Sequence, residues 1–257
     1  MLNFRNTTIL FIVLLLVLIG YDVSNNLSLV FYLLLALLYS LILFYGSYFV
    51  WSGFFIKVIC SVKTNKKEIA ISFDDGPANS YTPEILKVLG DYQVETAFFC
   101  IGNRIAGNEQ LLQQLLERGH IIGNHSYSHH FWFDLFSSKK MLADLKMMDR
   151  RVEAVTGLRP RLFRPPYGVT NPNLRKAIQQ GNYIPVGWSV RSMDTVINDE
   201  KKLLAKVMRS IKPGAIILFH DTSKTTLDIL PVFIRTVREQ GYVICRLDKM
   251  LTLNAYA

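Results

Sequence analysis

The sequence predicts an α/β fold: a distorted (β/α) barrel of about seven parallel strands, preceded by an α-helical membrane hairpin. Three observations carry this prediction. Two long segments near the start contain no charged residue, short apolar runs then alternate with amphipathic helical patterns, and unusual polar residues directly follow several of those runs. Because alternating strands and helices need crossover connections, the strands are expected to be parallel.

The start of the chain predicts two transmembrane segments, at about 7–22 and 28–51. Neither residues 9–20 nor the second segment contain a charge. The second is long enough for the roughly 20 residues that span a bilayer, whereas the first reaches across only with its flanks. A signal peptide is the alternative for the first, because Arg5 precedes it, but no small-x-small cleavage site follows. We therefore expect membrane lipid to contact residues 7–51.

The charges at the ends of the hairpin predict the side on which the following domain lies. Arg5 precedes the first segment, and a basic linker at 57–67 follows the second. By the positive-inside tendency, a hairpin puts both on the cytoplasmic side. If a single segment spans the membrane, the domain lies outside instead. The basic residues of the linker are Lys57, Lys63, Lys66 and Lys67.

Composition limits the partners of the soluble part. The formal net charge is +9, and residues 1–56 contribute only Arg5 and Asp22 to it. A basic domain beside a bilayer is attracted to anionic headgroups or to an acidic glycan. No nucleic acid is expected, because the basic residues are scattered and no nucleic-acid-binding motif is present. The three cysteines are odd in number and lack a Cys-x-x-Cys spacing, so no disulfide framework is expected.

Short apolar runs bounded by turn residues predict the strands, and capped amphipathic patterns predict the helices. The predicted strands are 69–73, 96–101, 120–124, 161–164, 184–190, 215–219 and 242–246. The clearest helices are Thr82 to Tyr92, with Thr82 as cap, Ser137 to Thr156 and Asn171 to Gln180. Seven such units in about 180 residues favour a closed or nearly closed barrel over an open sheet, although periodicity alone does not distinguish the two.

Polar residues follow the predicted strands at one end only. They are Asp74-Asp75 after the first strand, His125 after the third, Arg164 to Gly168 after the fourth, Arg191 to Asp194 after the fifth, and His220-Asp221 after the sixth. The carboxyl ends of parallel strands meet at one edge of the sheet, which is where barrel enzymes carry their active sites. The sequence therefore predicts a single site there.

Part of this set matches the ligands of a catalytic metal ion. Neighbouring carboxylates such as Asp74 and Asp75 raise each other's pKa, and a bound metal is a common reason to keep them together. His125 and His129 are four residues apart, a spacing that puts both imidazoles on one face of a helical turn. Two histidines with either Asp75 or Asp74 would leave a coordination position open for water, as catalytic zinc sites do.

Four motifs in this order resemble those of the polysaccharide deacetylases, a family of metal-dependent carbohydrate esterases of the cell envelope. The motifs are Ser72 to Pro77, His125 to His129, Arg164 to Gly168 and Leu218 to His220. The resemblance covers about Glu68 to Leu251, so that 68–251 is the expected catalytic domain and 252–257 a tail. It implies a hydrolase that acts on carbon-nitrogen bonds other than peptide bonds and removes N-acetyl groups from sugars.

The resemblance also implies a role for each matching residue. Asp75, His125 and His129 would bind zinc or another divalent transition metal. Asp74 would be the general base that deprotonates metal-bound water, the nucleophile of the reaction. Beside them, Arg164 would orient Asp74, the main-chain N–H of Tyr167 would stabilise the oxyanion, and His220 would protonate the leaving amine.

The chain departs from the family at its fourth motif, which in relatives reads Asp-x-x-Asp-Trp. Here Arg191 replaces the first Asp and Thr195 replaces the Trp, while Asp194 is present. In the family the first Asp tunes the acid histidine, so Asp194 or Asp221 would have to substitute for it. The same departure motivates an alternative, a catalytically degenerate member that binds glycan or metal without turnover.

The predicted function is therefore a membrane-anchored, metal-dependent N-deacetylase acting on an N-acetylated sugar of a polysaccharide or a lipid-linked glycan. Most family members act outside the cytoplasm, whereas the lysines after the second segment favour the cytoplasmic side. The aromatic run Phe131-Trp132-Phe133 is interpreted either as a platform for a sugar ring or as ordinary loop packing.

Overall fold

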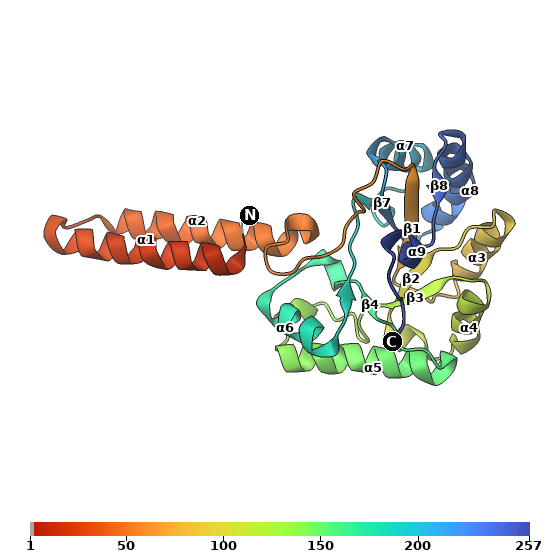
Figure 1. The fold of residues 1–257 in the computed structure, drawn as a ribbon, viewed down its shortest axis with the longest axis horizontal. Coiled ribbons are helices and arrows are strands. Elements are labelled where there is room, and N and C mark those ends of the chain that lie inside the picture. The colour runs from red at the N-terminus through yellow and green to blue at the C-terminus, as the bar shows by residue number, and fades with distance from the viewer. Residues whose placement is uncertain (1–2) are drawn as a thin grey trace.

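The computed structural model describes residues 3–257 and consists of a long helical hairpin that projects from an α/β domain (Figure 1). The hairpin is formed by α1 (Phe4–Asn25) and α2 (Leu29–Tyr48). Both helices are long and apolar enough to cross a membrane by length and composition. Their aliphatic side chains are largely exposed, which in water would cost about 25 cal/mol for each Å² of apolar surface.

Polar contacts close the tip of the hairpin and tie its two helices together. Asp22 accepts hydrogen bonds from the Leu27 N–H at 2.5 Å and from the Tyr32 hydroxyl at 2.9 Å. Nearer the domain, the hydroxyls of Thr8 and Tyr39 are 2.9 Å apart. These bonds fix α1 and α2 as an antiparallel pair whose two free ends both lie at the domain.

The base of the hairpin is bonded directly to the domain. The Phe4 N–H donates to the Phe54 carbonyl at 3.1 Å, and the Thr170 N–H donates to the Ser47 carbonyl at 3.0 Å. Close packing adds to these bonds, since a Cβ at Gly46 would lie 2.2 Å from the Phe54 ring. The hairpin is therefore held in one orientation relative to the loop before α6.

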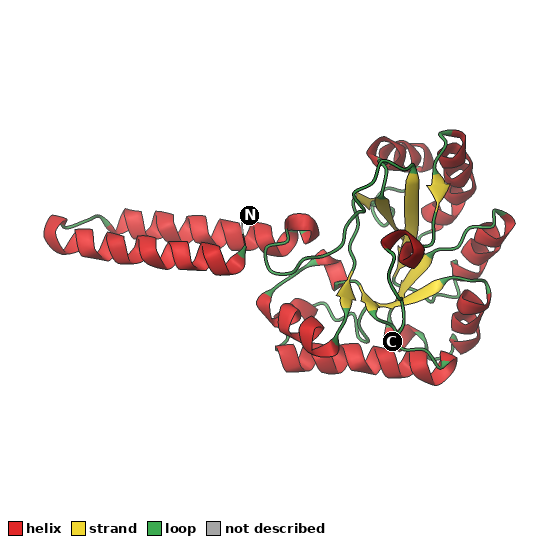
Figure 2. Ribbon diagram, in the orientation of Figure 1, coloured by secondary structure: helices red, strands yellow, loops and turns green. Residues whose placement is uncertain are grey.

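One parallel sheet forms the centre of the domain (Figure 2). Its strands are β1 (Glu68–Asp74), β2 (Ala97–Cys100), β3 (Ile121–Asn124), β4 (Leu162–Phe163), β5 (Ile184–Pro185), β6 (Val190–Arg191), β7 (Ala215–His220) and β8 (Val243–Ile244). Seven strands follow the order β5-β4-β3-β2-β1-β7-β6, and β8 pairs with the start of β1. The predicted distorted barrel of parallel strands is confirmed, and it is a curled half-barrel rather than a closed one.

The predicted strand at 184–190 is wrong as a single element. It divides into β5, which pairs with β4, and β6, which pairs with β7 at the opposite edge. Between them the Val186 N–H donates to Phe163, and the Ser189 N–H donates to Ile216. This segment therefore crosses the gap between the two edges, and an apolar run does not reveal that its neighbours change halfway.

Helices cover the outer face of the sheet. They are α3 (Thr82–Asp91), α4 (Glu109–Glu117), α5 (Ser138–Thr156), α6 (Pro172–Gly181), α7 (Glu200–Ser210) and α8 (Lys224–Glu239), whereas α9 (Leu247–Leu251) lies on the inner face. Short 3₁₀ turns lie at Val50–Ser52, Gly102–Arg104, Phe133–Leu135 and Pro166–Gly168. The largest buried cluster joins β1, β2 and β7 to α3, α4, α7 and α8. A second cluster lies on the other face of the sheet, where Leu247 and Met250 of α9 cover Ala70 and Phe99.

The segments on either side of the expected catalytic domain pack onto the sheet. Ile59 bridges to Val186 in parallel, and Ser61 bridges to Ala215 in the antiparallel sense. At the other end of the chain, the Tyr256 hydroxyl accepts a hydrogen bond from the Ile122 N–H at 2.8 Å. Residues 57–67 are thus in contact with the sheet rather than extended between two separate parts.

Gly214 provides a test of this packing. Its φ is +77°, and a Cβ there would lie 1.9 Å from the Val62 carbonyl oxygen, whereas Gly157 has φ +72° and open space around it. We expect Gly157→Ala to cost about 1 kcal/mol of unfolding free energy from left-handed backbone strain, and Gly214→Ala to cost at least about 2 kcal/mol more from the clash. Denaturant unfolding of the full chain in detergent measures both, and equal losses would contradict the packing of residues 57–67.

Candidate active site

Loops from four strands converge at the carboxyl edge of the sheet, as the sequence predicts. Asp74 ends β1 and lies beside His220, which ends β7, in the parallel register. Asn124, the last residue of β3, lies beside Phe163 of β4 in the same way. Asp75, His125 and Arg164 each follow one of these strand ends, so strand order brings them to one edge of the sheet.

Arg164 is the centre of this arrangement and is fully buried. Its Nη1 donates to Asp74 Oδ1 at 2.7 Å and to Ser72 Oγ at 2.8 Å. The other two donor groups are satisfied by main-chain oxygens, Nε by Val186 at 3.2 Å and Nη2 by Gly187 at 2.9 Å. Burial lowers the pKa of Arg164, and the charge of Asp74 opposes that shift. A guanidinium remains protonated in proteins, so the pair with Asp74 is ionic.

The main chain of Arg164 also orients His125. Nδ1 of this histidine lies 2.9 Å from the Arg164 carbonyl oxygen. A carbonyl only accepts, so Nδ1 carries the proton and the lone pair is on Nε2. Main-chain carbonyls orient metal-binding histidines in the same way elsewhere. One residue thus fixes both the carboxylate of Asp74 and the imidazole of His125.

Three side chains present ligand atoms to one point. Their ligand atoms, from Asp75, His125 and His129, all lie within 4.8 Å of one another. Asp75 Oδ1 lies 3.7 Å from His125 Nε2 and 3.6 Å from His129 Nε2. Burial and the neighbouring His125 lower the pKa of His129 to about 4, so its imidazole is neutral and able to bind a metal at pH 7. The donor set fits a divalent transition metal.

Asp74 lies beside this triad but is engaged elsewhere. Its Oδ1 is bonded to Arg164, and its Oδ2 lies 3.7 Å from His125 Nε2. Because the guanidinium holds Oδ1, Oδ2 remains free to accept a proton at the edge of the ligand cluster. The structure therefore distinguishes the two neighbouring aspartates, which the sequence leaves interchangeable.

The expectation that His125 and His129 share a helical turn is wrong. Residues 125–130 form an irregular loop, and Ser126 and His129 have φ values of 67° and 43°. Buried carboxamide and carboxylate groups hold the loop instead of helical hydrogen bonds. Asn124 Oδ1 accepts from the Ser126 N–H at 2.8 Å, and Asp144 Oδ1 accepts from the Tyr127 N–H at 2.7 Å.

Reasoning from the sequence missed these supporting residues. Asn124 also donates from its Nδ2 to Asp149 at 2.8 Å, and Asp149 accepts a hydrogen bond from the Tyr183 hydroxyl at 2.5 Å. The one available signal was the presence of Asp144 and Asp149 on the buried side of an amphipathic helix. Buried carboxylates need partners, and here those partners belong to the loop that carries His125 and His129.

Backbone strain is concentrated around the site. Among residues 3–257, nine residues other than glycine have a positive φ. Five of them lie in loops at the carboxyl edge of the sheet: Asp75, Ser126, His129, Tyr167 and Met193. Such conformations cost about 1–3 kcal/mol each and persist where surrounding bonds over-determine them, which is typical of functional loops.

Tyr167 lies over the triad in one of these strained conformations, with φ 58° and ψ 0°. Its ring meets the His129 ring edge-on at 4.7 Å between centroids, and its side chain is 45% exposed. Within residues 3–257 its main-chain N–H has no hydrogen-bond partner. The donor predicted for an oxyanion is thus unoccupied and belongs to a backbone held by Pro165 and Pro166.

His220 and Asp194 form the second charged pair of the site. His220 Nδ1 lies 2.7 Å from Asp194 Oδ1, and the His220 N–H donates to Asp194 Oδ2 at 2.7 Å. Ser192 and Thr226 hydroxyls donate to the same carboxylate. Burial alone would lower the pKa of His220, but the hydrogen bond and charge of Asp194 raise it to about 9. Burial would likewise raise the pKa of Asp194, and the pairing with His220 lowers it instead.

Asp221, the other expected partner of His220, makes no hydrogen bond to it. The Thr82 hydroxyl donates to Asp221 Oδ2 at 2.6 Å, and Thr82 therefore joins α3 to the site rather than capping that helix. Burial raises the pKa of Asp221 to about 7. A Cβ at Gly76 would lie 1.9 Å from Asp221 Oδ2, so this carboxyl supports the turn that carries Asp75.

Comparison with known proteins agrees with this geometry. A family model described as polysaccharide deacetylase matches residues 61–186. The peptidoglycan-N-acetylmuramic acid deacetylase PdaA of Bacillus subtilis is 33% identical over 192 residues, which cover 73% of this chain and 73% of that protein. The chain belongs to the polysaccharide deacetylase family. A crystal structure of PdaA, a family 4 carbohydrate esterase, superposes with a TM-score of 0.70 at 30% identity, covering 76% of this chain and 85% of that one.

Two further relatives, one named a deacetylase and one a pseudoenzyme, are informative. A peptidoglycan-N-acetylglucosamine deacetylase of Bacillus cereus is 33% identical over 203 residues, covering 76% of this chain and 92% of that protein. A structure of BA3943 from Bacillus anthracis, described as a pseudoenzyme of the same esterase family, has a TM-score of 0.70 at 30% identity, covering 75% of this chain and 68% of that chain. Similar overall structures thus include both named deacetylases and a named pseudoenzyme.

Within residues 3–257, the two residues that depart from the family's fourth motif make no hydrogen bond or ion pair with His220. Arg191 and Thr195 are both exposed, and the Arg191 guanidinium lies 5.9 Å from the centre of the Trp188 ring. The buried position beside His220 is filled by Asp194. Of the two candidates that the sequence leaves open, Asp194 is therefore the one that tunes this histidine.

The His220–Asp194 pair predicts a distinct titration. We expect NMR of labelled histidine to show His220 protonated at pH 7 and titrating near pH 9, and to show its pKa below 7 in Asp194→Asn. Because the folded-state pKa exceeds the unfolded value of about 6.5, the stability from this pair is fully present below pH 6.5 and lost as the pH rises through about 9. A His220 pKa near 6.5 in the native chain would contradict the pairing.

Proposed function

We propose that this chain is a membrane-anchored, metal-dependent N-deacetylase that hydrolyses the N-acetyl group of a sugar in a cell-envelope glycan. One observation carries the proposal. A three-ligand cluster lies beside an aspartate held by a buried arginine, and the strand register puts this aspartate next to a histidine held protonated by a buried aspartate. A candidate base and a candidate acid beside one potential metal site support the proposal, because the hydrolysis of an amide requires both.

Asp75, His125 and His129 would hold the ion, through one carboxylate oxygen and two imidazole nitrogens. A bound divalent cation, zinc or a similar transition metal, supplies a Lewis acid and lowers the pKa of water. The Arg164 carbonyl fixes the tautomer of His125 that has its lone pair on Nε2, and burial keeps the His129 imidazole neutral. Both contributions exist in the polypeptide itself before any ion binds.

Asp74 is the proposed general base. Its Oδ2 is the carboxylate oxygen left free by Arg164, and it faces the ligand cluster. It would accept the proton of the attacking water while Arg164 keeps its orientation fixed. Preorganisation of this kind avoids reorientation during the reaction and typically contributes factors of about 10²–10⁴ in rate.

His220 is the proposed general acid, and Tyr167 the proposed oxyanion donor. With a pKa of about 9, His220 is protonated at neutral pH and can give its Nε2 proton to the departing amine. The free N–H of Tyr167 can donate to the oxygen that becomes negative when the amide carbon is attacked. Asp194 acts through His220 and is therefore a positioning residue.

An aromatic rim beside the triad is the proposed surface for the sugar. Phe131 and Trp132 are 69% and 56% exposed, and the Phe131 ring lies 6.5 Å from that of Tyr167. Phe133, by contrast, is buried, so only part of the predicted aromatic platform is available. Exposed flat rings next to a catalytic cluster can stack against sugar rings. Relatives are named for both N-acetylglucosamine and N-acetylmuramic acid.

The hairpin is the proposed membrane anchor, and it would keep the active site close to the membrane surface. A substrate there would be a glycan of the wall or a saccharide still carried on a lipid. The lysines after α2 favour a domain on the cytoplasmic side of the membrane, where a lipid-linked saccharide would be the substrate. Assembled peptidoglycan would require the domain to lie on the outer side of the membrane.

A catalytically degenerate protein is the second candidate, because BA3943 shows that this fold is found in a named pseudoenzyme. The present chain retains each residue of the proposed mechanism. Although Arg191 replaces the first aspartate of the fourth motif, Asp194 provides the carboxylate that pairs with His220. A degenerate member would bind metal and glycan without releasing acetate.

The deacetylase proposal predicts acetate release from N-acetylglucosamine oligomers or from peptidoglycan by the full chain in detergent with zinc. Asp74→Asn is expected to lower the rate at least 100-fold, because it removes the proton acceptor. It is expected to retain zinc, because Asp74 is outside the ligand triad. Removing both His125 and His129 is expected to abolish zinc binding.

Asp91→Asn on the surface of α3 is the matched control and should leave the rate unchanged. If wild-type protein binds zinc stoichiometrically but releases no acetate from either substrate or from a lipid extract of the source cells, the degenerate alternative is correct.

The hairpin predicts that both ends of the chain lie on one side of the membrane. Reporter domains active in a single compartment, fused in turn to the N-terminus and the C-terminus, should be active in the same compartment. Active reporters on opposite sides would contradict two membrane crossings. The compartment in which both are active decides between a cytoplasmic lipid-linked substrate and an outer one.

A further inference from the structure

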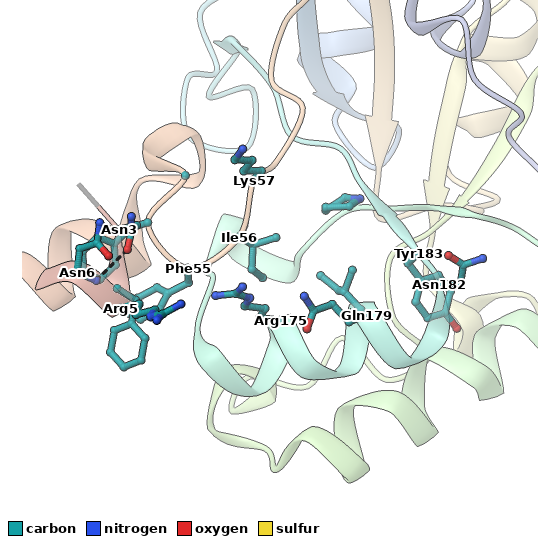
Figure 3. A pocket seen from close by; sticks show the side chains of 15 residues that line it. Asn3, Arg5, Asn6, Phe55, Ile56, Lys57, Arg175, Gln179, Asn182 and Tyr183 are labelled. Carbon is teal, nitrogen blue, oxygen red and sulfur yellow. Dashed lines mark hydrogen bonds between the residues drawn. The ribbon is translucent and has the colours of Figure 1, made fainter. Parts of the chain in front are cut away.

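A basic cleft lies where the hairpin joins the domain, apart from the active site (Figure 3). It has a volume of about 770 Å³. One side is formed by the start of α1 and the segment after α2, and the facing side by α6, as Arg5, Phe55 and Arg175 show in the figure. The Phe4 and Phe55 rings, 5.1 Å apart between centroids, hold the start of α1 against the segment after α2 on the first of these sides.

The charge of the cleft is entirely positive. Arg5, Lys57 and Arg175 line it, and no aspartate or glutamate does. All three cationic side chains are exposed, and within residues 3–257 none of them forms an ion pair or a side-chain hydrogen bond. The side-chain amides of Asn6 and Gln179 add neutral donors to the lining. Uncompensated cations and amide donors around one cavity are a suitable environment for an anion.

The position of the cleft indicates which anion is available. It lies at the end of the hairpin where α1 begins and α2 ends, next to the exposed aromatic residues Phe44, Tyr45, Tyr48 and Trp51. Tyrosine and tryptophan gather at the level of lipid headgroups. If the apolar surface of the hairpin lies in the hydrocarbon, the cleft is at the depth of the headgroup phosphates.

We propose that this cleft binds the phosphate of an anionic phospholipid headgroup. Arg5 and Arg175 reach the phosphate from its two sides, and Lys57 adds a third charge. Guanidinium groups suit the oxygens of a phosphate because they donate in pairs. Phe4 and Phe55 border the cleft where the glycerol and the first acyl carbons would lie. The proposal rests on the membrane placement of the hairpin, but on no step of the proposed catalysis.

Binding of this kind would set the height and tilt of the catalytic domain. The hairpin alone allows the domain to sit at a range of heights above the bilayer. A headgroup held between α1 and α6 would fix α6 at the headgroup plane. Since α6 follows the loop that carries Tyr167, the active site would then lie at a constant distance from the membrane.

The test uses the full chain in maltoside micelles and native mass spectrometry with added lipid. We expect phosphatidylglycerol to bind at least about tenfold more tightly than phosphatidylcholine, which carries the same phosphate without net charge. The double variant Lys57→Gln/Arg175→Gln should lose this preference, about tenfold or more in Kd. The control Lys201→Gln/Arg209→Gln removes two exposed charges from α7 and should keep it.

Equal affinity of the Lys57→Gln/Arg175→Gln variant for phosphatidylglycerol would overturn the proposal. So would displacement of the lipid by an equimolar amount of inorganic phosphate, which would show an anion site that does not select lipid. Flotation of the full chain with phosphatidylcholine vesicles tests the anchor separately. Flotation without lipid selectivity therefore refutes the cleft alone, whereas failure to float refutes the membrane placement.

Discussion

The buried guanidinium of Arg164 is the interaction on which the site depends. It satisfies its donors with Asp74, Ser72 and the carbonyls of Val186 and Gly187, which belong to β1 and to the segment crossing between the sheet edges. A buried, unpaired charge would cost several kcal/mol, so these partners are required together. Because its own carbonyl also orients His125, one residue couples the base, a metal ligand and the half-open sheet.

The half-barrel makes this coupling possible. In a closed barrel the carbonyls of residues 186–187 would be paired in a ladder, whereas here the chain crosses the gap and directs them to Arg164. The same crossing leads into the loop after β6, which brings Asp194 beneath His220. Two charged pairs result: the Arg164 guanidinium orients the Asp74 carboxylate, and Asp194 keeps the His220 imidazole protonated.

The strand ends and the motif residues could be predicted from the sequence, because apolar runs that stop at polar groups mark the edge of a parallel sheet. The conformation of the His125–His129 loop could not, since its spacing matches a helix and its true support comes from Asn124 and the distant Asp144. The sequence also could not show that Asp194, and not Asp221, pairs with His220. Asp221 is adjacent to His220 in the sequence, but its side chain points toward Thr82.

The most direct test of the central claim is a crystal structure of the zinc-loaded protein, with the ion located by its anomalous scattering. Because Arg164 holds Asp74 and leaves Asp75 free, this account predicts that Asp75, His125 and His129 bind the ion. Asp74 should remain paired to the guanidinium and should not coordinate the ion. An ion bound through Asp74, or one that leaves His129 unliganded, would contradict this account of how the two aspartates differ.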